Sequence, residues 1–175
     1  MGKDKKHKTN RIRRLTTDAV FVSIALILSY VEFLLPPIST AFPGIKMGLA
    51  NVAVICALYL FGAKDAVAVS AVRLCLVALL FGNPLSLAYS AGGATLSLGI
   101  MIVLKKTDRF STVGVSVAGG VLHNVGQVLI AMIFFATPGI AYYLIVLNVT
   151  GTASGILVGL ASGFVLHVLK NRYRA

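Results

Sequence analysis

Residues 147–168 read LNVTGTASGILVGLASGFVLHV, a run without any Asp, Glu, Lys or Arg. A helix needs about 20 mainly apolar residues to span a bilayer, and this run is long enough. Four glycines recur in it at every fourth position: Gly151, Gly155, Gly159 and Gly163. Such a glycine ridge lets a neighbouring backbone approach closely. It predicts helix packing, either within the chain or as a docking face for a partner subunit.

The whole chain shares this apolar character. Of its 175 residues, 58% are hydrophobic and 12% are charged, whereas soluble chains are about 45–50% apolar and about 25% charged. A water-soluble fold of this size could not bury so many apolar side chains. We therefore expect an all-α integral membrane protein that crosses the cell membrane several times. A soluble enzyme and a nucleic-acid-binding domain are excluded.

Prolines, glycines and charged residues divide the chain into six apolar segments. The predicted spans cover about 18–35, 47–62, 65–82, 85–104, 112–136 and 140–169. They form one six-helix transmembrane domain over residues 16–170, between a basic cytoplasmic tail at 1–15 and a short cytoplasmic tail at 171–175. Thr16, Thr17 or Asp18 can cap the first helix.

Most positive charges lie on one side of these spans. Seven of the sixteen Lys and Arg precede the first span, and seven more fall in segments on the same side of the membrane. Lys46 lies on the opposite side, and Arg73 lies within the third span. Because positive residues are retained in the cytoplasm, both termini are predicted to be cytoplasmic. The net charge of +11 is thus a topology signal, with the lipid bilayer and not nucleic acid as the partner.

Polar side chains inside the spans are costly in lipid, so each needs a partner or a function. Most of them fall in the outer half of the predicted bundle. We interpret them, with one lysine on the adjoining loop, as the lining of a substrate-binding pocket open to the outside: Lys46, Asn51, Arg73, Tyr89, His123, Gln127 and Asn148. The two cations would attract an anionic solute, and the amides and hydroxyls would orient it.

Arg73 is the most informative of these residues, because a buried guanidinium needs a carboxylate, a set of carbonyls or an anionic ligand. Glu32 is the carboxylate at a reachable depth in the predicted spans. A structural Glu32–Arg73 pair and a contact with an acidic substrate both remain open. For His123 and Gln127, which share a helix face, interhelical hydrogen bonding is the alternative to ligand contact.

Sequence motifs for catalysis are absent. The chain has five acidic residues, and no two of them are spaced to hold magnesium and a diphosphate. It has no Walker A loop, no GxSxG and no His/Cys spacing typical of a metal site. We therefore predict no catalytic and no metal-binding residues, and an ATP-driven process would need a separate ATPase.

Four segments carry a resemblance to a known family: PGIKMGLANVAVICALYLFG (43–62), AKDAVAVSAVRLCLVALLFG (63–82), SAGGATLSLGIMIVLKK (90–106) and GGVLHNVGQVLIA (119–131). Over roughly residues 15–170 the chain resembles the Gx transporters, a family also labelled heptaprenyl diphosphate synthase component I. That family is similar to the substrate-binding S components of energy-coupling factor (ECF) vitamin transporters. The resemblance implies six helices, cytoplasmic termini, an outward-facing pocket and a link to flavin-based extracellular electron transfer or demethylmenaquinone synthesis.

Two functions are compatible with these observations. The first is an S-component-like transport subunit that captures a small anionic or amphipathic solute from outside and works with a transmembrane coupling protein and separate ATPases. The second is an accessory membrane subunit of heptaprenyl diphosphate or menaquinone synthesis, or of flavin-based extracellular electron transfer, with electron-transfer membrane proteins as partners. A vitamin, a flavin, a quinone or a prenyl lipid fits as the ligand. An enzyme is the least favoured class.

The charge bias leads to a prediction about topology. A reporter fused behind Ala175 is expected to be cytoplasmic, and a tag inserted in the 36–46 loop is expected to react with a membrane-impermeant label in intact cells. A labelled C-terminus together with a protected loop would contradict this orientation.

Overall fold

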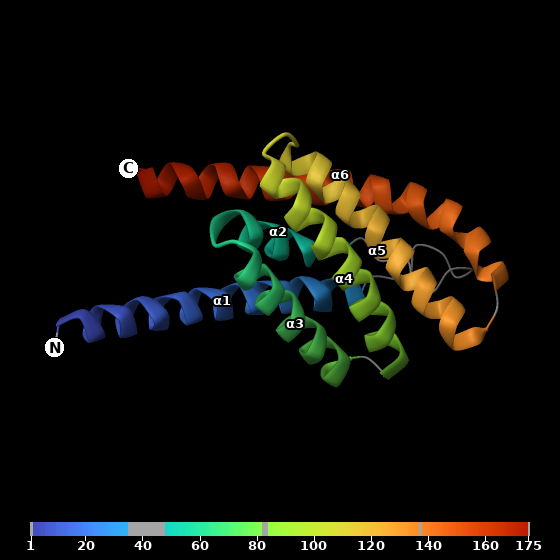
Figure 1. The fold of residues 1–175 in the computed structure, drawn as a ribbon, viewed down its shortest axis with the longest axis horizontal. Helices are drawn as coiled ribbons and strands as arrows, with labels where there is room; N and C mark the ends of the chain where they lie inside the picture. The colour runs from blue at the N-terminus through green and yellow to red at the C-terminus, as the bar shows by residue number, and fades with distance from the viewer. Residues whose placement is uncertain (1, 35–47, 82–83, 137, 175) are drawn as a thin grey trace.

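The computed structural model describes residues 2–34, 48–81, 84–136 and 138–174 (Figure 1). Within these ranges the chain forms six α-helices and no strand. The helices are α1 (Gly2–Leu34), α2 (Asn51–Leu60), α3 (Ala63–Leu80), α4 (Pro84–Thr107), α5 (Thr112–Phe135) and α6 (Tyr143–Arg174), with a short 3₁₀ helix, η1 (Pro138–Tyr142), before α6. The all-α prediction is confirmed.

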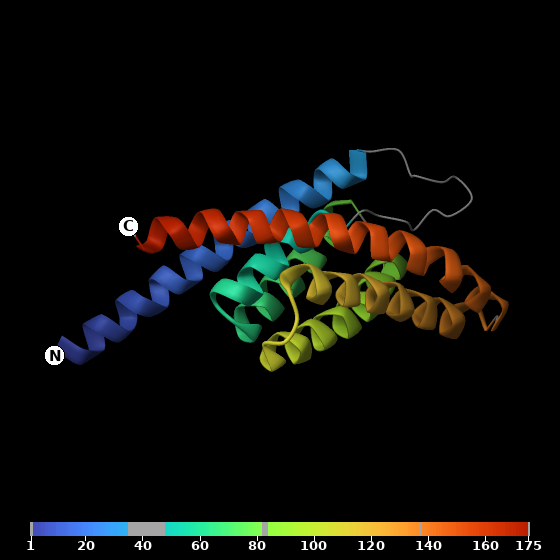
Figure 2. The same ribbon diagram turned by 90° about the horizontal axis from the view of Figure 1, so that it is seen from above.

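The first helix begins earlier than the sequence suggested. We expected a cap near residue 16, but α1 starts at Gly2 and continues through the basic segment into the apolar one. The Thr16 hydroxyl donates to the Ile12 carbonyl, 3.0 Å away in the preceding turn, and does not cap a new helix. Lysine and arginine have high helix propensity, which favours this continuation. The N-terminal part of α1 extends away from the other helices (Figure 2).

Four segments are long and apolar enough to cross a membrane: Arg14–Leu34, Leu87–Thr107, Thr112–Phe135 and Leu144–Leu169. The second helix is apolar, but its ten residues rise only about 15 Å, half the thickness of the hydrocarbon core. The third helix has 18 residues, among them Lys64, Asp65 and Arg73, which lower its hydropathy. The structure therefore describes a membrane protein with four candidate spans among its six helices.

The helices form two groups. In one group, α5 packs extensively against both α4 and α6. In the other, α1 packs on α2 and α3. The groups meet where α3 contacts α4 and where α2 contacts α6. The short α2 lies at the centre, and all six residues from Ala53 to Leu58 are at most 2% exposed.

Glycines set the close packing of α5 against α6. A Cβ added at Gly155 would lie 2.8 Å from the Val117 Cα, and one at Gly159 would lie 2.7 Å from the Val113 Cα. Gly151 faces the Asn124 amide and the Gly120 carbonyl in the same way. The predicted ridge thus packs within the chain at three of its four glycines, while the space beside the fourth, Gly163, is open.

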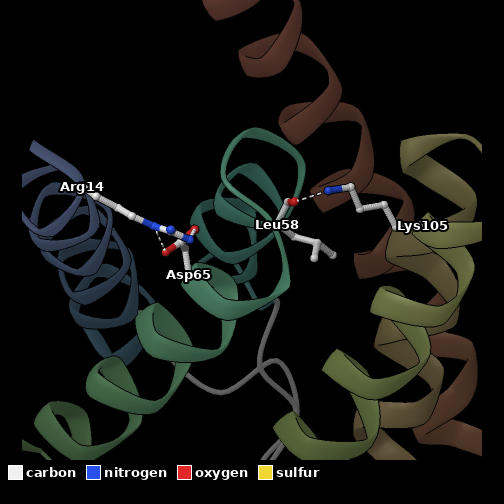
Figure 3. Close-up of polar contacts among 4 residues, drawn as sticks. All are labelled: Arg14, Leu58, Asp65 and Lys105. Carbon is white, nitrogen blue, oxygen red and sulfur yellow. Dashed lines mark hydrogen bonds and ion pairs between the residues drawn. The ribbon is translucent and has the colours of Figure 1, made fainter. Parts of the chain in front are cut away.

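Two polar contacts fasten the end of the bundle where α2 turns into α3 (Figure 3). Arg14 of α1 binds both carboxylate oxygens of Asp65 in the first turn of α3, at 2.7 and 2.5 Å. Lys105 of α4 donates to the Leu58 carbonyl near the C-terminus of α2, at 2.5 Å. Between α2 and α3 the chain turns through Gly62, whose φ of 108° is strained for any other residue.

Gly159→Leu tests the close packing of α6. The added side chain would meet backbone atoms of α5, and overpacking of this kind costs about 1–3 kcal/mol or more. We expect a lower midpoint of thermal unfolding for the detergent-solubilised protein.

Two variants on the same helix serve as controls. Gly163→Leu adds the same bulk one turn further along, where nothing lies within 4 Å, and Leu160→Ala trims a side chain that is 57% exposed. A Gly159→Leu protein that unfolds at the wild-type temperature would show that α5 and α6 do not need this contact.

Candidate functional site

A cavity of about 310 Å³ lies between the two helix groups, and all six helices contribute to its lining. Its volume is at the lower end of the range for small-molecule sites, about 300–1,000 Å³. The side of α5 that faces the cavity carries Ser116, Gly119, Gly120, His123, Asn124 and Gln127. These positions recur with the period of one helix face. One continuous face of α5 therefore lines the cavity.

Several residues that the sequence marked as polar and intramembrane lie on this cavity: Glu32, Asn51, Arg73, His123 and Gln127. Gly151 and Gly155 of the ridge also line it, so packing and cavity lining share residues on α6. Two other candidates, Tyr89 and Asn148, do not line the cavity. The remaining one, Lys46, lies outside the described residues.

Arg73 lies on the cavity wall with a guanidinium that is largely withdrawn from solvent. The residue is 9% exposed, and its Nε has no hydrogen-bond partner within the described residues. The hydroxyl of Ser29, on α1, is buried on the same cavity and also lacks a partner in the described part of the chain. An unsatisfied buried polar group costs free energy, so each of these two atoms would be stabilised by a hydrogen-bonding group that reaches it from the cavity.

Glu32 places a negative charge near this guanidinium. The carboxylate interacts electrostatically with Arg73 and accepts a hydrogen bond from the backbone N–H of Gly48. Gly48 has a φ of 70°, a left-handed conformation that favours glycine. The turn before α2 thereby holds Glu32 beside the cavity. Whether the pair is structural or serves a ligand stays a prediction.

Two polar residues of α5 contact the helices that flank it, Asn124 on α6 and His123 on α4. The Asn124 amide donates to the Leu147 carbonyl of α6, which is an interhelical bond of the kind expected in a membrane. His123 lies against α4, where a Cβ added at Gly93 would come within 2.9 Å of the imidazole ring. A residue larger than glycine at position 93 would displace this ring from the cavity wall.

Serines were missed by the sequence analysis. Five of them line the cavity: Ser29, Ser90, Ser97, Ser116 and Ser154. A serine in a transmembrane helix often bonds the carbonyl three or four residues earlier, as Ser154 does with Gly151 at 3.2 Å. Residue type alone does not separate such a serine from one in a binding site. Spacing was the available signal, because Ser116 lies seven residues before His123 on α5 and Ser90 lies seven residues before Ser97 on α4, so each pair shares a helix face.

The two predicted residues that do not line the cavity are also in unusual surroundings. Tyr89 packs edge-on against Phe134 of α5, with ring centres 6.5 Å apart. The Tyr89 hydroxyl and the Asn148 side-chain oxygen are buried without a hydrogen-bond partner in the described ranges. They remain candidates for ligand contact, as the sequence predicts, although they do not belong to the lining of the cavity at Arg73.

Aromatic side chains bound the cavity where α1 and α3 end. Phe33 of α1 stacks on Phe81, the residue after α3, with ring centres 5.5 Å apart. Tyr30 packs against the same ring at 5.3 Å. Both Phe33 and Phe81 line the cavity. This end of the site is therefore apolar, whereas the part near Arg73 is polar.

No group of three or more His, Cys, Asp or Glu that could bind a metal ion is found among the described residues. The two cysteines are unpaired, with Cys56 buried and Cys75 exposed. Asp18 and Asp65, the two carboxylates that interact across α1 and α3, lie near Arg14 and away from the cavity lining. The site thus offers hydrogen bonds, one cation and one anion, and an apolar end.

Comparison with known proteins gives one family. Neither the curated proteins nor the solved structures contain a match to this chain. A family described as heptaprenyl diphosphate synthase component I matches residues 21–165, which include the cavity-lining parts of all six helices. The chain therefore belongs to the heptaprenyl diphosphate synthase component I family.

Proposed function

We propose that this protein is a solute-binding membrane subunit, similar to an S component of an ECF transporter, and that the cavity around Arg73 holds its ligand. The observation that carries the proposal is a buried guanidinium whose Nε is unpartnered in the described structure and lies on a cavity lined by all six helices. A charge is expensive inside a membrane protein unless it has a partner or a function. A bound acceptor group would supply that partner.

The ligand is a small anionic or amphipathic molecule, such as a vitamin, a flavin or an isoprenoid- or quinone-related compound. Arg73 supplies positive charge, and Asn51, His123 and Gln127 supply hydrogen bonds that orient the ligand. Lys46, Tyr89 and Asn148 are further contacts in this proposal. Glu32 holds the guanidinium in place and offsets part of its charge.

In the proposed topology all six helices lie in the cell membrane as one domain over residues 16–170, and both termini are cytoplasmic. The short α2 is buried among the other helices, and Asp65 and Arg73 of α3 are buried at 5% and 9% exposure, which supports the placement of both helices although each is a poor span alone. A transmembrane coupling protein and separate ATPases would provide transport. On α1 the small residues Ala19 and Ser23 are exposed, but they do not form the alanine series, one at every fourth position, with which ECF S components dock on such a partner.

The family description favours a second function, an accessory subunit of heptaprenyl diphosphate or menaquinone synthesis. It names a first component, which implies another synthase component as a partner. In this role, as in electron transfer with other membrane proteins, the chain would bind a prenyl lipid, a quinone or a flavin without performing the reaction itself. Co-purification of a synthase subunit with the protein from its native membrane would favour this function over transport.

The binding role can be tested by native mass spectrometry of the protein purified from its cell membrane. We expect a small molecule at about one copy per chain in the wild type and its loss in Arg73→Met, because the unpartnered guanidinium is the proposed anchor. Arg109→Met, which removes an exposed arginine at the α4–α5 turn, should retain the molecule. Equal retention by both variants would contradict the proposal.

Stability measurements separate a structural from a ligand-binding Arg73. If Glu32 and Arg73 form a structural pair, Arg73→Met and Glu32→Gln should each lower the unfolding temperature, and the double variant should recover part of the loss. If Arg73 mainly binds ligand, the ligand-free Arg73→Met protein should be as stable as wild type, and only stabilisation by ligand should disappear. Thermal unfolding of all four proteins, with and without the co-purified molecule, distinguishes these outcomes.

We expect a mixed result, in which Glu32 positions the guanidinium and the guanidinium contacts the ligand. Equal stability and an unchanged ligand response in all four proteins would contradict both roles.

A further inference from the structure

The wall that α3 gives to the cavity changes from polar to apolar along its length. Arg73, Leu74, Val77 and Phe81 line the cavity in that order. Phe81 lies eight positions after Arg73, which corresponds to about 12 Å along a helix. A molecule that lies along this wall meets a cation at one end and an aromatic ring at the other.

The first helix also brings polar and aromatic side chains to the cavity. Ser29 and Glu32 line it, and Phe33, the residue after Glu32, lines it beside Phe81. Phe33 is also 55% exposed on the outside of the bundle. A residue that both lines a cavity and is more than half exposed marks a place where the cavity reaches the molecular surface. This surface belongs to the apolar segment Arg14–Leu34, a candidate membrane span, so it faces lipid when α1 crosses the bilayer.

Stacked aromatic side chains close the cavity at the point where it reaches the surface beside Phe33. Phe33 and Tyr30 of α1 contact Phe81, and α1 packs mainly on α2 and α3. Ring contacts of this kind can rearrange without breaking backbone hydrogen bonds. By contrast, the opposite wall is made by α4, α5 and α6, whose glycine backbones are in direct contact. The side between α1 and α3 is therefore the one through which a hydrocarbon chain can leave.

The polar end requires an acceptor. Arginine only donates hydrogen bonds, and Nε of Arg73 is free within the described residues. The hydroxyl of Ser29, another residue of the cavity lining, is also unpartnered there. A phosphate or carboxylate group offers acceptor oxygens for both donors. Because the Glu32 carboxylate already acts on Arg73, a single compact anionic head fits this end better than several anionic groups spread through the cavity.

We infer, on the basis of the proposed function, that the ligand is a single-chain amphiphile. Its anionic, oxygen-rich head lies against Arg73 and Ser29, and its hydrocarbon chain passes Leu74 and Val77 and enters the bilayer between Phe33 and Phe81. A compact water-soluble solute would make no use of this lipid-facing end. The inference thus names the ligand class and its route of exit from the cavity.

Binding of three probes to the protein in nanodiscs of phosphatidylcholine tests this inference: dodecyl phosphate, inorganic phosphate and dodecanol. We expect dodecyl phosphate to bind at least about tenfold more tightly than either the head or the chain alone, because the chain adds buried apolar area. Binding to empty nanodiscs is subtracted. Farnesyl phosphate in parallel shows whether an isoprenoid chain is preferred to a straight one.

Binding to single-residue variants shows which side chains contact the head of the ligand and which contact its chain. Phe33→Ala and Phe81→Ala should each weaken dodecyl phosphate binding by about five- to tenfold and leave inorganic phosphate unaffected, because each loses aromatic contact with the chain. Arg73→Met should remove the binding of both probes. Phe164→Ala, which trims an α6 ring that is 71% exposed and does not line the cavity, should bind like the wild type.

Photo-crosslinking of the wild-type protein provides a test that needs no variant. An alkyl phosphate with a diazirine at the chain end should label peptides around Phe33 and Phe81. Labelling of α5 or α6 instead, or equal affinities for dodecyl phosphate and inorganic phosphate, would overturn the inference. If a compact soluble molecule binds in an Arg73-dependent way, the proposed function survives and this inference fails. If no probe and no co-purified molecule depends on Arg73, both fail.

Discussion

The direct contact of glycine backbones in α4, α5 and α6 is the constraint on which the rest of this structure depends. A Cβ added at Gly126 would lie 2.5 Å from the Gly92 carbonyl oxygen, and one at Gly120 would lie 2.6 Å from that of Gly151. Lipid tails are as apolar as leucine, so burial of apolar surface does little to hold helices together in a bilayer. Close van der Waals contact has to do so, and side chains larger than hydrogen would prevent it. These three helices form the fixed half of the molecule.

The cavity follows from this arrangement. The other half, α1 to α3, packs against the fixed half mainly through α3–α4 and α2–α6 contacts, which leaves the space between them incompletely filled. Polar side chains from both halves face that space, and the hydrogen bond from Asn124 to Leu147 ties α5 to α6 beside it. Arg73 lies on the less tightly packed half. Its guanidinium thus lies on the cavity wall, where Glu32 of α1 offsets part of its charge and where we propose that a bound molecule contacts it.

The helices and part of the site could be predicted from the sequence, because apolar runs, prolines and glycines mark the helix ends and buried polar residues are rare in membrane proteins. The depth of a residue in the membrane does not determine whether its side chain faces the cavity, a neighbouring helix or lipid. Tyr89 precedes Ser90, which lines the cavity, and one residue along a helix corresponds to a rotation of about 100°. Asn148 lies almost one turn before Gly151, the first cavity residue on α6. The continuous α1 was missed because a change from charged to apolar residues does not by itself end a helix.

The first helix runs from the Arg14–Asp65 ion pair to the wall of the cavity. Its inner part is fixed to α3 by a bidentate pair in which the Asp65 side chain is 6% exposed, and such paired hydrogen bonds restrict both distance and orientation. Its C-terminal part carries Ser29, Glu32 and Phe33 on the cavity and is held by ring contacts and by the hydrogen bond that Glu32 accepts from the Gly48 backbone. A small rotation about the fixed end would displace the outer residues most, because displacement grows with distance from the pivot. The wall that carries Ser29, Glu32 and Phe33 can therefore move while the glycine-packed half stays in place.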